Sequence, residues 1–289
     1  FVFFDAEALS AFMKKVFVLF SISLATLFFT NCKTDKKMQD FKLVTENYFK
    51  DKNELNPLDA TLNGFNEYND KLQLEMTDNY RKKQADFFDN YEKQLSAIDA
   101  NDLSAEEKIS YEIIKWETSV GKDLLKQESN LMPIHQFWGT HLTMSQFASG
   151  TAAQPFKTEK EYRNFLKRMD AYTIWLDSAM VYMKKGIEKG MVLPKTLTEK
   201  VIPQFQDQIT PKVEDNLFYS AIKIMPADFS ESVKASLKKE YATAINENRM
   251  PRYKKMAEFL KTEYLPASRA TSGIGSLPNG KDLYSVYVK

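Results

Sequence analysis

The sequence predicts a mainly α-helical protein built from many helices, and three observations support this fold class. Glycine and proline are scarce, at 9 and 10 copies in 289 residues, whereas residue types that favour helix, such as Lys, Glu, Leu, Ala and Met, are plentiful. Apolar residues recur every three or four positions through most of the chain. Residues that cap helices precede several of these stretches. The 43% hydrophobic content is enough to bury one large core or two modest ones.

Two long helices are expected in the first half of the chain. A shorter helical pattern at Phe41, Val44 and Tyr48 precedes them and is interrupted at Pro57 and Gly64. The first long helix follows residue 77, and its apolar side is expected to contain Tyr80, Phe87, Phe88, Tyr91, Leu95 and Ile98. The second begins at a capping box formed by residues 104 and 107, and its apolar side is expected to contain Ile109, Ile113, Trp116, Val120 and Leu124.

Helical patterns also fill most of the second half. Residues 129–157 lose the helical period and gather aromatic, His, Gly and Pro residues, which is typical of a functional loop or of one packed over the core. Thr158 and Glu161 then cap a long helix that ends near Gly190. Further helices are expected after Pro194, from Thr210 and Pro211, and over about 230–264, the last broken or kinked before Pro251.

The last segment predicts a β-strand. Asn279 and Gly280 form a tight-turn pair, and residues 283–288, LYSVYV, are rich in β-formers. A strand needs a partner for its backbone groups, and no second strong strand follows. We therefore expect the chain to stop inside a domain, with this strand cut from its sheet.

The N-terminal region resembles a bacterial lipoprotein signal. Two lysines follow Met13, an apolar run extends from Val16 to Phe29, and Cys32, the only cysteine, comes after two further residues, Thr30 and Asn31. The run is shorter than the roughly 18 residues that cross a bilayer, which makes a resident membrane span the weaker interpretation. An ordinary cleavable signal with an incidental cysteine is the other alternative. In a lipoprotein Cys32 becomes the lipidated first residue, and Lys33 after it favours the outer membrane, on its periplasmic or its cell-surface face.

These features divide the chain into four parts. Residues 1–12 lack a starting Met and are interpreted as upstream mistranslation, residues 13–31 as the lipoprotein signal peptide, residues 32–40 as a tether, and residues 41–289 as a helical domain. A lone cysteine excludes an internal disulfide framework and a Cys-rich zinc site. The net charge of +1 provides no field for nucleic-acid binding, so no nucleic-acid partner is expected, and the oligomeric state is not indicated.

Motifs that would assign a reaction are missing from the sequence. Zinc hydrolases commonly use H-E-x-x-H, but the two histidines here, His135 and His141, are six apart and flank Gly139. They are interpreted either as pocket-lining residues that contact a substrate or as polar members of a packed loop. Ser-x-x-Lys occurs at Ser119, Ser220 and Ser236 without its companion motifs, so these matches are attributed to chance. We therefore assign no catalytic residue and no metal ligand.

Three stretches together resemble the bacterial domain of unknown function 885 family. They are NPLDATLNGFNEYNDKL at 56–72, the helical stretch at 155–195 that ends in GMVLPK, and EYLPASRATSGIGSLPNGKDLYSVYVK at 263–289. This family is similar to zinc metallopeptidases of the H-E-x-x-H type, which are large, mostly helical proteins often exported as lipoproteins. The resemblance implies a metallopeptidase-like helical fold, of which this chain is the N-terminal part, a zinc cofactor in the full-length protein and a peptide substrate.

In the family the metal-binding helix follows the LPNG stretch, and no residue here matches it. The resemblance therefore assigns no zinc ligand and no catalytic residue within the chain, which is expected to be inactive alone. The 129–157 loop and the last segment are candidates for substrate contact, through His135, Trp138, His141, Asn279 and Tyr284.

Two functions stay open at this point. In the first, the chain is the N-terminal fragment of an exported, zinc-dependent, peptidase-like hydrolase, bound to the membrane through its lipid. In the second, it is a complete, non-enzymatic helical surface lipoprotein that binds a peptide, a glycan or a protein. An H-E-x-x-H motif encoded beyond Lys289 would separate them.

Overall fold

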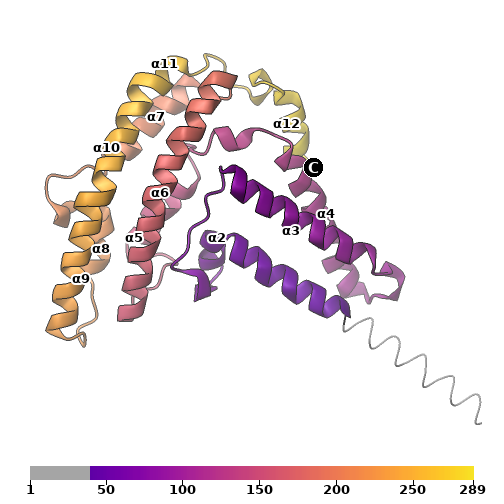
Figure 1. Ribbon diagram of the computed structural model, residues 1–289, viewed down its shortest axis with the longest axis horizontal. Coiled ribbons are helices and arrows are strands. Elements are labelled where there is room, and N and C mark those ends of the chain that lie inside the picture. The colour runs from indigo at the N-terminus through magenta and orange to yellow at the C-terminus, as the bar shows by residue number, and fades with distance from the viewer. Residues whose placement is uncertain (1–39) are drawn as a thin grey trace, which may run out of the picture. The chain divides into compact units, whose positions relative to one another are not determined.

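The computed structural model describes residues 40–289, and the regular structure in this range is helical (Figure 1). The mainly α-helical class predicted from the sequence is therefore confirmed. The β-type pairing recorded within these residues is an isolated bridge between Pro194 and Arg269. None of the helices in the described range is both long and apolar enough to span a bilayer.

The helices follow one another through the whole described range. Residues 40–55 form the first, and the others are α2 (Pro57–Leu62), α3 (Asp78–Ser96), α4 (Ala105–Leu125), α5 (Thr140–Ala148), α6 (Glu159–Lys189), α7 (Lys195–Gln206), α8 (Ser220–Lys223), α9 (Glu231–Thr243), α10 (Met250–Phe259), α11 (Leu265–Ala267) and α12 (Gly280–Tyr287). Two π-helical segments, Ala244–Arg249 and Leu260–Tyr264, flank α10. The irregularity expected before Pro251 is thus a π-helical segment, a feature that commonly bends helices.

The described residues fall into two compact units. Unit 1 contains residues 40–49 and 91–116, and unit 2 contains residues 50–90 and 117–289. Aromatic contacts hold unit 1 together: the Phe41 and Tyr111 ring centroids lie 6.2 Å apart, and Tyr48 packs edge-on against Tyr91 at 4.9 Å. Such edge-on pairs are favoured because the positive edge of one ring meets the negative face of the other.

The inward face of α4 in unit 1 is not the face expected from its apolar residues. Ile114 is buried, whereas Ile109, Ile113 and Trp116, which were expected to lie on the core side, are exposed. Helical periodicity shows that these three residues share one face of α4, but it does not show whether other side chains cover that face.

The long helix α6 lies in the middle of unit 2. Figure 1 shows α9 and α10 beside α6, and both helices contact it. The expected capping box is present, because the Thr158 hydroxyl accepts from the Glu161 amide and the Glu161 carboxylate accepts from the Thr158 amide. The helix ends at Gly190, whose φ of 72° suits glycine. Its core side chains include Tyr162, Phe165, Met169, Tyr172, Trp175, Leu176, Ala179 and Met183.

Arg168 of α6 is fully buried. Its guanidinium donates to the carbonyl oxygens of Pro57, Tyr68 and Lys71 at 3.2, 2.7 and 2.9 Å, and to Gln154 Oε1 and Thr61 Oγ1 at 2.6 and 2.9 Å. Burial lowers the pKa of Arg168 to about 9, so the group keeps its charge at neutral pH. This one side chain ties residues 57–71 to the central helix.

Two further sequence expectations are corrected by the structure. No continuous helix starts at Thr210; residues 213–219 instead form two short 3-10 turns before α8. The strand expected at 283–288 is also wrong, because these residues belong to α12 and the following turn. Leu283 and Val286, three residues apart, are both buried, while Tyr284, Tyr287 and Val288 are exposed. That one-sided spacing suits a helix, and packing of this face overrides the β propensity.

The backbone also favours a helix start at residue 280. Asn279 adopts the left-handed conformation, with a φ of 53°, and a Cβ on Gly280 would lie 2.0 Å from the Ile274 carbonyl oxygen. Only glycine fits at such a close approach. The backbone of α12 is paired within the helix itself, so the idea that this segment was cut from a sheet is overturned.

Replacing Arg168 with Met should lower the free energy of unfolding by at least about 3 kcal/mol, because several buried acceptors lose their donor at once. Chemical denaturation measures this loss. The matched control is Arg163→Met on the same helix, where the half-exposed guanidinium pairs with Glu159 and Glu240 and the cost should stay within about 1 kcal/mol. Equal losses in the two variants would contradict the role given to Arg168.

Candidate functional site

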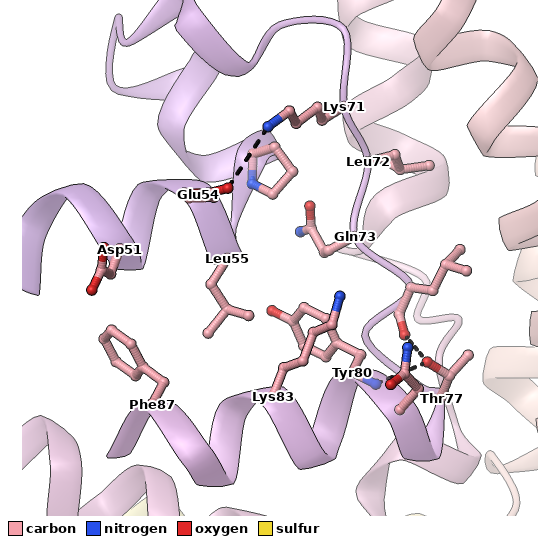
Figure 2. A pocket seen from close by; sticks show the side chains of 13 residues that line it. Asp51, Glu54, Leu55, Lys71, Leu72, Gln73, Thr77, Tyr80, Lys83 and Phe87 are labelled. Carbon is pink, nitrogen blue, oxygen red and sulfur yellow. Dashed lines mark hydrogen bonds and ion pairs between the residues drawn. The ribbon is translucent and has the colours of Figure 1, made fainter. Parts of the chain in front are cut away.

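A pocket of about 570 Å³ lies within unit 2 (Figure 2). One wall comes from the end of the first helix, where Asp51, Glu54 and Leu55 share a face because they are three and four residues apart. Another wall comes from α3, where Tyr80, Lys83 and Phe87 share a face by the same rule. The irregular segment 71–74 forms a third wall of the pocket. The remaining lining residues are Pro57, Thr77 and Asn79.

Several polar groups that line the pocket already have partners. The Tyr80 hydroxyl donates to Asn56 Oδ1 at 2.7 Å, and burial raises the pKa of Tyr80, which keeps this donor protonated. The Leu58 amide donates to Gln73 Oε1 at 3.3 Å, and the Lys71 ammonium lies 3.9 Å from Glu54.

Lys83 differs from these groups, since it forms no hydrogen bond or ion pair among the described residues, and Figure 2 shows its side chain extending from α3 toward the pocket. The pocket can therefore hold an apolar group against Leu55, Phe87 and the Tyr80 ring, with an anion at Lys83.

Glu75 directly follows the segment that lines the pocket. Its carboxylate accepts from the Thr140 hydroxyl at 2.7 Å and from Trp175 Nε1 at 2.9 Å to both oxygens. Burial raises the pKa of Glu75, and the two hydrogen bonds partly oppose this shift. Glu75 thus connects the segment before α3 to α5 and α6. No sequence motif indicated that Glu75 has this role. The one sequence feature that could have done so is its position as a single acidic residue among Leu72, Leu74 and Met76.

The predicted contact residues of the 129–157 loop are split between the surface and the core. His135 stacks on Trp138 with ring centroids 3.6 Å apart and planes 11° apart, and its Nδ1 accepts from the Phe137 amide at 3.2 Å. Phe137 and Trp138 are 69% and 64% exposed. Burial lowers the pKa of His135. The three rings together form an exposed aromatic platform.

His141 lies instead in the core, on α5, so residues 140–148 of the expected loop are helical. Its ring stacks on Phe205 at 5.4 Å, and Nε2 is 3.2 Å from Gln204 Oε1, while Nδ1 has no partner among the described residues. Burial lowers the pKa of His141 to about 4, so the ring is neutral at pH 7. The structure therefore gives His135 and His141 different surroundings.

Asn279 and Tyr284, the other predicted contact residues, lie at the start of α12 and along it. Tyr284 is 55% exposed, and Asn279 sits at the N-cap position. Among the described residues no hydrogen bond or ring contact joins either of them to His135, Trp138 or His141. Substrate contact through these five residues stays a prediction.

Metal ligands were not predicted in this chain, and the part of it that the structure describes contains no group of three or more His, Cys, Asp or Glu residues that could hold an ion. The predicted lipidation site, Cys32, lies outside the described residues, as do the signal peptide and residues 1–12. Among the described residues, the pocket and the aromatic platform both present groups that can bind a ligand.

Comparison with known proteins gives a family and a fold. A family model described as "Bacterial protein of unknown function (DUF885)" matches residues 57–289. The chain is also similar to a solved structure described as that of "the putative lipoprotein from Colwellia psychrerythraea", with a TM-score of 0.69 and 14% identity. The match covers 88% of this chain and 45% of that chain, so the chain spans less than half the length of that protein. No curated protein matches.

The buried His141 should make stability fall as pH falls. Its folded pKa, about 4, lies below its ordinary value of 6.5, so the unfolded chain binds the proton first and stability is lost between these two values. Between pH 7.5 and pH 4.5 the wild type should lose about 2.5 kcal/mol more unfolding free energy than His141→Gln. Urea denaturation at both pH values measures the difference. The control His135→Gln should retain most of the wild-type loss, and an unchanged loss in His141→Gln would refute the assignment.

Proposed function

Since the chain belongs to the bacterial DUF885 family, we propose that it is the N-terminal helical part of an exported, lipid-anchored, zinc-dependent peptidase-like hydrolase. The metal-binding motif of this hydrolase lies outside these 289 residues. The observation that carries the proposal is the match over residues 57–289 together with a fold shared over 88% of this chain but 45% of a longer protein.

The sequence before the helical domain supports the lipid anchor. The lysines after Met13, the apolar run to Phe29 and the cysteine at position 32 follow the order of a lipoprotein signal. The solved structure with the shared fold is described as a putative lipoprotein. Acyl chains on Cys32 would hold the protein on a membrane without spanning it, and Lys33 favours the outer membrane.

The hydrolase part rests on the resemblance of the family to zinc metallopeptidases. A zinc ion bound by the full-length protein would polarise a water and a peptide carbonyl. This chain's own role would be to hold substrate. The exposed stack of His135 and Trp138 offers aromatic faces to a peptide, and the pocket between the first helix and α3 offers apolar walls with a lysine.

The product of the complete gene tests both parts of the proposal. Labelled fatty acid should be incorporated by the wild type and by the neighbouring control Thr34→Ala, but not by Cys32→Ala. The purified protein should contain zinc by elemental mass spectrometry and should hydrolyse peptides in a reaction that a chelator stops. Labelling that survives in Cys32→Ala would refute the anchor, and a product without zinc or peptide hydrolysis would refute the hydrolase.

A non-enzymatic binding function is the second candidate, and the pocket of unit 2 is the observation that favours it. An apolar C-terminal residue of a peptide would place its side chain against Leu55 and Phe87 and its carboxylate at Lys83. This chemistry needs no group from outside the chain.

The tripeptide Ala-Ala-Phe with a free carboxylate should bind the protein more tightly than its C-terminal amide, as measured by calorimetry. Lys83→Met should weaken binding of the carboxylate form about tenfold or more, since a charge-assisted hydrogen bond is worth about 1.5–3 kcal/mol. The matched control is Lys82→Met, because Lys82 pairs with Asp86 at 2.7 Å and does not line the pocket. Equal affinities for the acid and the amide would argue against this candidate.

A further inference from the structure

An apolar stripe on α4 is open to solvent. Ile109, Ile113 and Trp116 are 62%, 52% and 53% exposed, and Lys108 and Glu112 border them. Positions i, i+4 and i+7 lie on one face of a helix, so the three side chains form one continuous stripe. Exposed apolar side chains that gather in this way mark a surface that meets something apolar.

Exposed apolar side chains are concentrated in unit 1. Of the fourteen exposed large hydrophobic residues of the described chain, five belong to this unit, although it contributes only residues 40–49 and 91–116. These five are Leu43, Phe49, Ile109, Ile113 and Trp116. Unit 1 therefore presents more apolar surface for its size than the rest of the described chain.

The covalent chain fixes how far unit 1 can lie from a lipid attached to Cys32. The described part of the first helix covers residues 40–55, and residues 40–49 belong to unit 1. Eight Cα steps separate Cys32 from Asp40, and a fully extended chain covers at most about 29 Å over that span. The Phe41 ring lies 6.2 Å from the Tyr111 ring of α4, so α4 is close to the start of the described chain and a membrane that holds Cys32 is within its reach.

We propose that the α4 stripe of Ile109, Ile113 and Trp116 rests in the interfacial layer of the bilayer that holds the lipidated Cys32. This inference rests on the proposed lipid anchor. Tryptophan is enriched at the interface, because its ring is apolar and its N–H can reach water or headgroups, and isoleucine buries apolar surface beneath it.

Apolar burial rather than charge attraction accounts for this contact. The described residues of unit 1 contain eight Asp or Glu and four Lys, so anionic headgroups would repel the unit. A second copy of the chain fits the stripe less well, because three half-exposed side chains are few against the roughly 800 Å² per partner of a stable protein interface. The contact with lipid is therefore expected on uncharged phosphatidylcholine and in high salt.

Tryptophan fluorescence in vesicles tests the proposal on the full lipidated protein. The chain has three tryptophans, of which Trp175 is buried, so Trp138→Phe leaves Trp116 as the exposed emitter. In phosphatidylcholine vesicles with acyl chains brominated near the headgroup, this variant should lose Trp116 emission, in low and in high salt. The matched variant Trp116→Phe, which keeps the exposed Trp138, should lose little. Adding Ile109→Ser and Ile113→Ser to Trp138→Phe should restore emission.

The outcomes separate this inference from the proposed anchor. Fatty-acid labelling at Cys32 with an unquenched Trp116 overturns the inference and leaves the anchor standing. A wild type without label, released from membranes, overturns the anchor and this inference with it. Self-association in ultracentrifugation that Ile113→Ser abolishes, with Trp116 unquenched in vesicles, overturns the inference in favour of a second copy as the occupant.

Discussion

The buried guanidinium of Arg168 is the interaction on which the arrangement of unit 2 depends. A charged group without a carboxylate partner is costly to bury, and here five neutral acceptors replace its water. Three of them are backbone carbonyls of residues 57, 68 and 71, which belong to a stretch of short helical turns joined by irregular connections. Because the planar guanidinium donates in fixed directions, it determines where this stretch lies on α6.

The position of the segment that closes the pocket, and of the Glu75 carboxylate after it, depends on these Arg168 contacts. Segment 71–74 begins at the carbonyl that Arg168 holds and continues directly into Glu75, which is fixed by Thr140 and Trp175. Two polar side chains, the buried cation Arg168 and the half-buried acid Glu75, therefore hold the two ends of the segment that closes the pocket. A buried hydrogen-bonded group specifies geometry more sharply than apolar packing does, because a misplaced donor or acceptor loses its partner altogether.

Much of the helical framework could be predicted from local sequence, since local chemistry determines it. The capping box at Thr158 and Glu161 and the end of α6 at Gly190 are present as expected. The prediction was wrong at α12, where β-forming residues adopt the helix that their tertiary packing selects. Neither Arg168 nor Glu75 could be recognised as a link between segments, because their hydrogen-bond partners lie far away in the sequence. Whether His135 and His141 lie at the surface or in the core likewise depends on tertiary packing, which helical periodicity does not predict.

A lipid anchor and an apolar helix face have different effects on a protein at a membrane: the first sets its affinity and the second its orientation. Acyl chains set affinity, at about 0.8 kcal/mol for each buried CH₂, but a chain attached through a short tether can still rotate about its anchor. A stripe such as that on α4 adds little affinity beside several acyl chains. It limits rotation, since only one orientation of unit 1 removes Ile109, Ile113 and Trp116 from water. On this argument the lipid determines how firmly the protein is held, and α4 determines which side of unit 1 faces the bilayer.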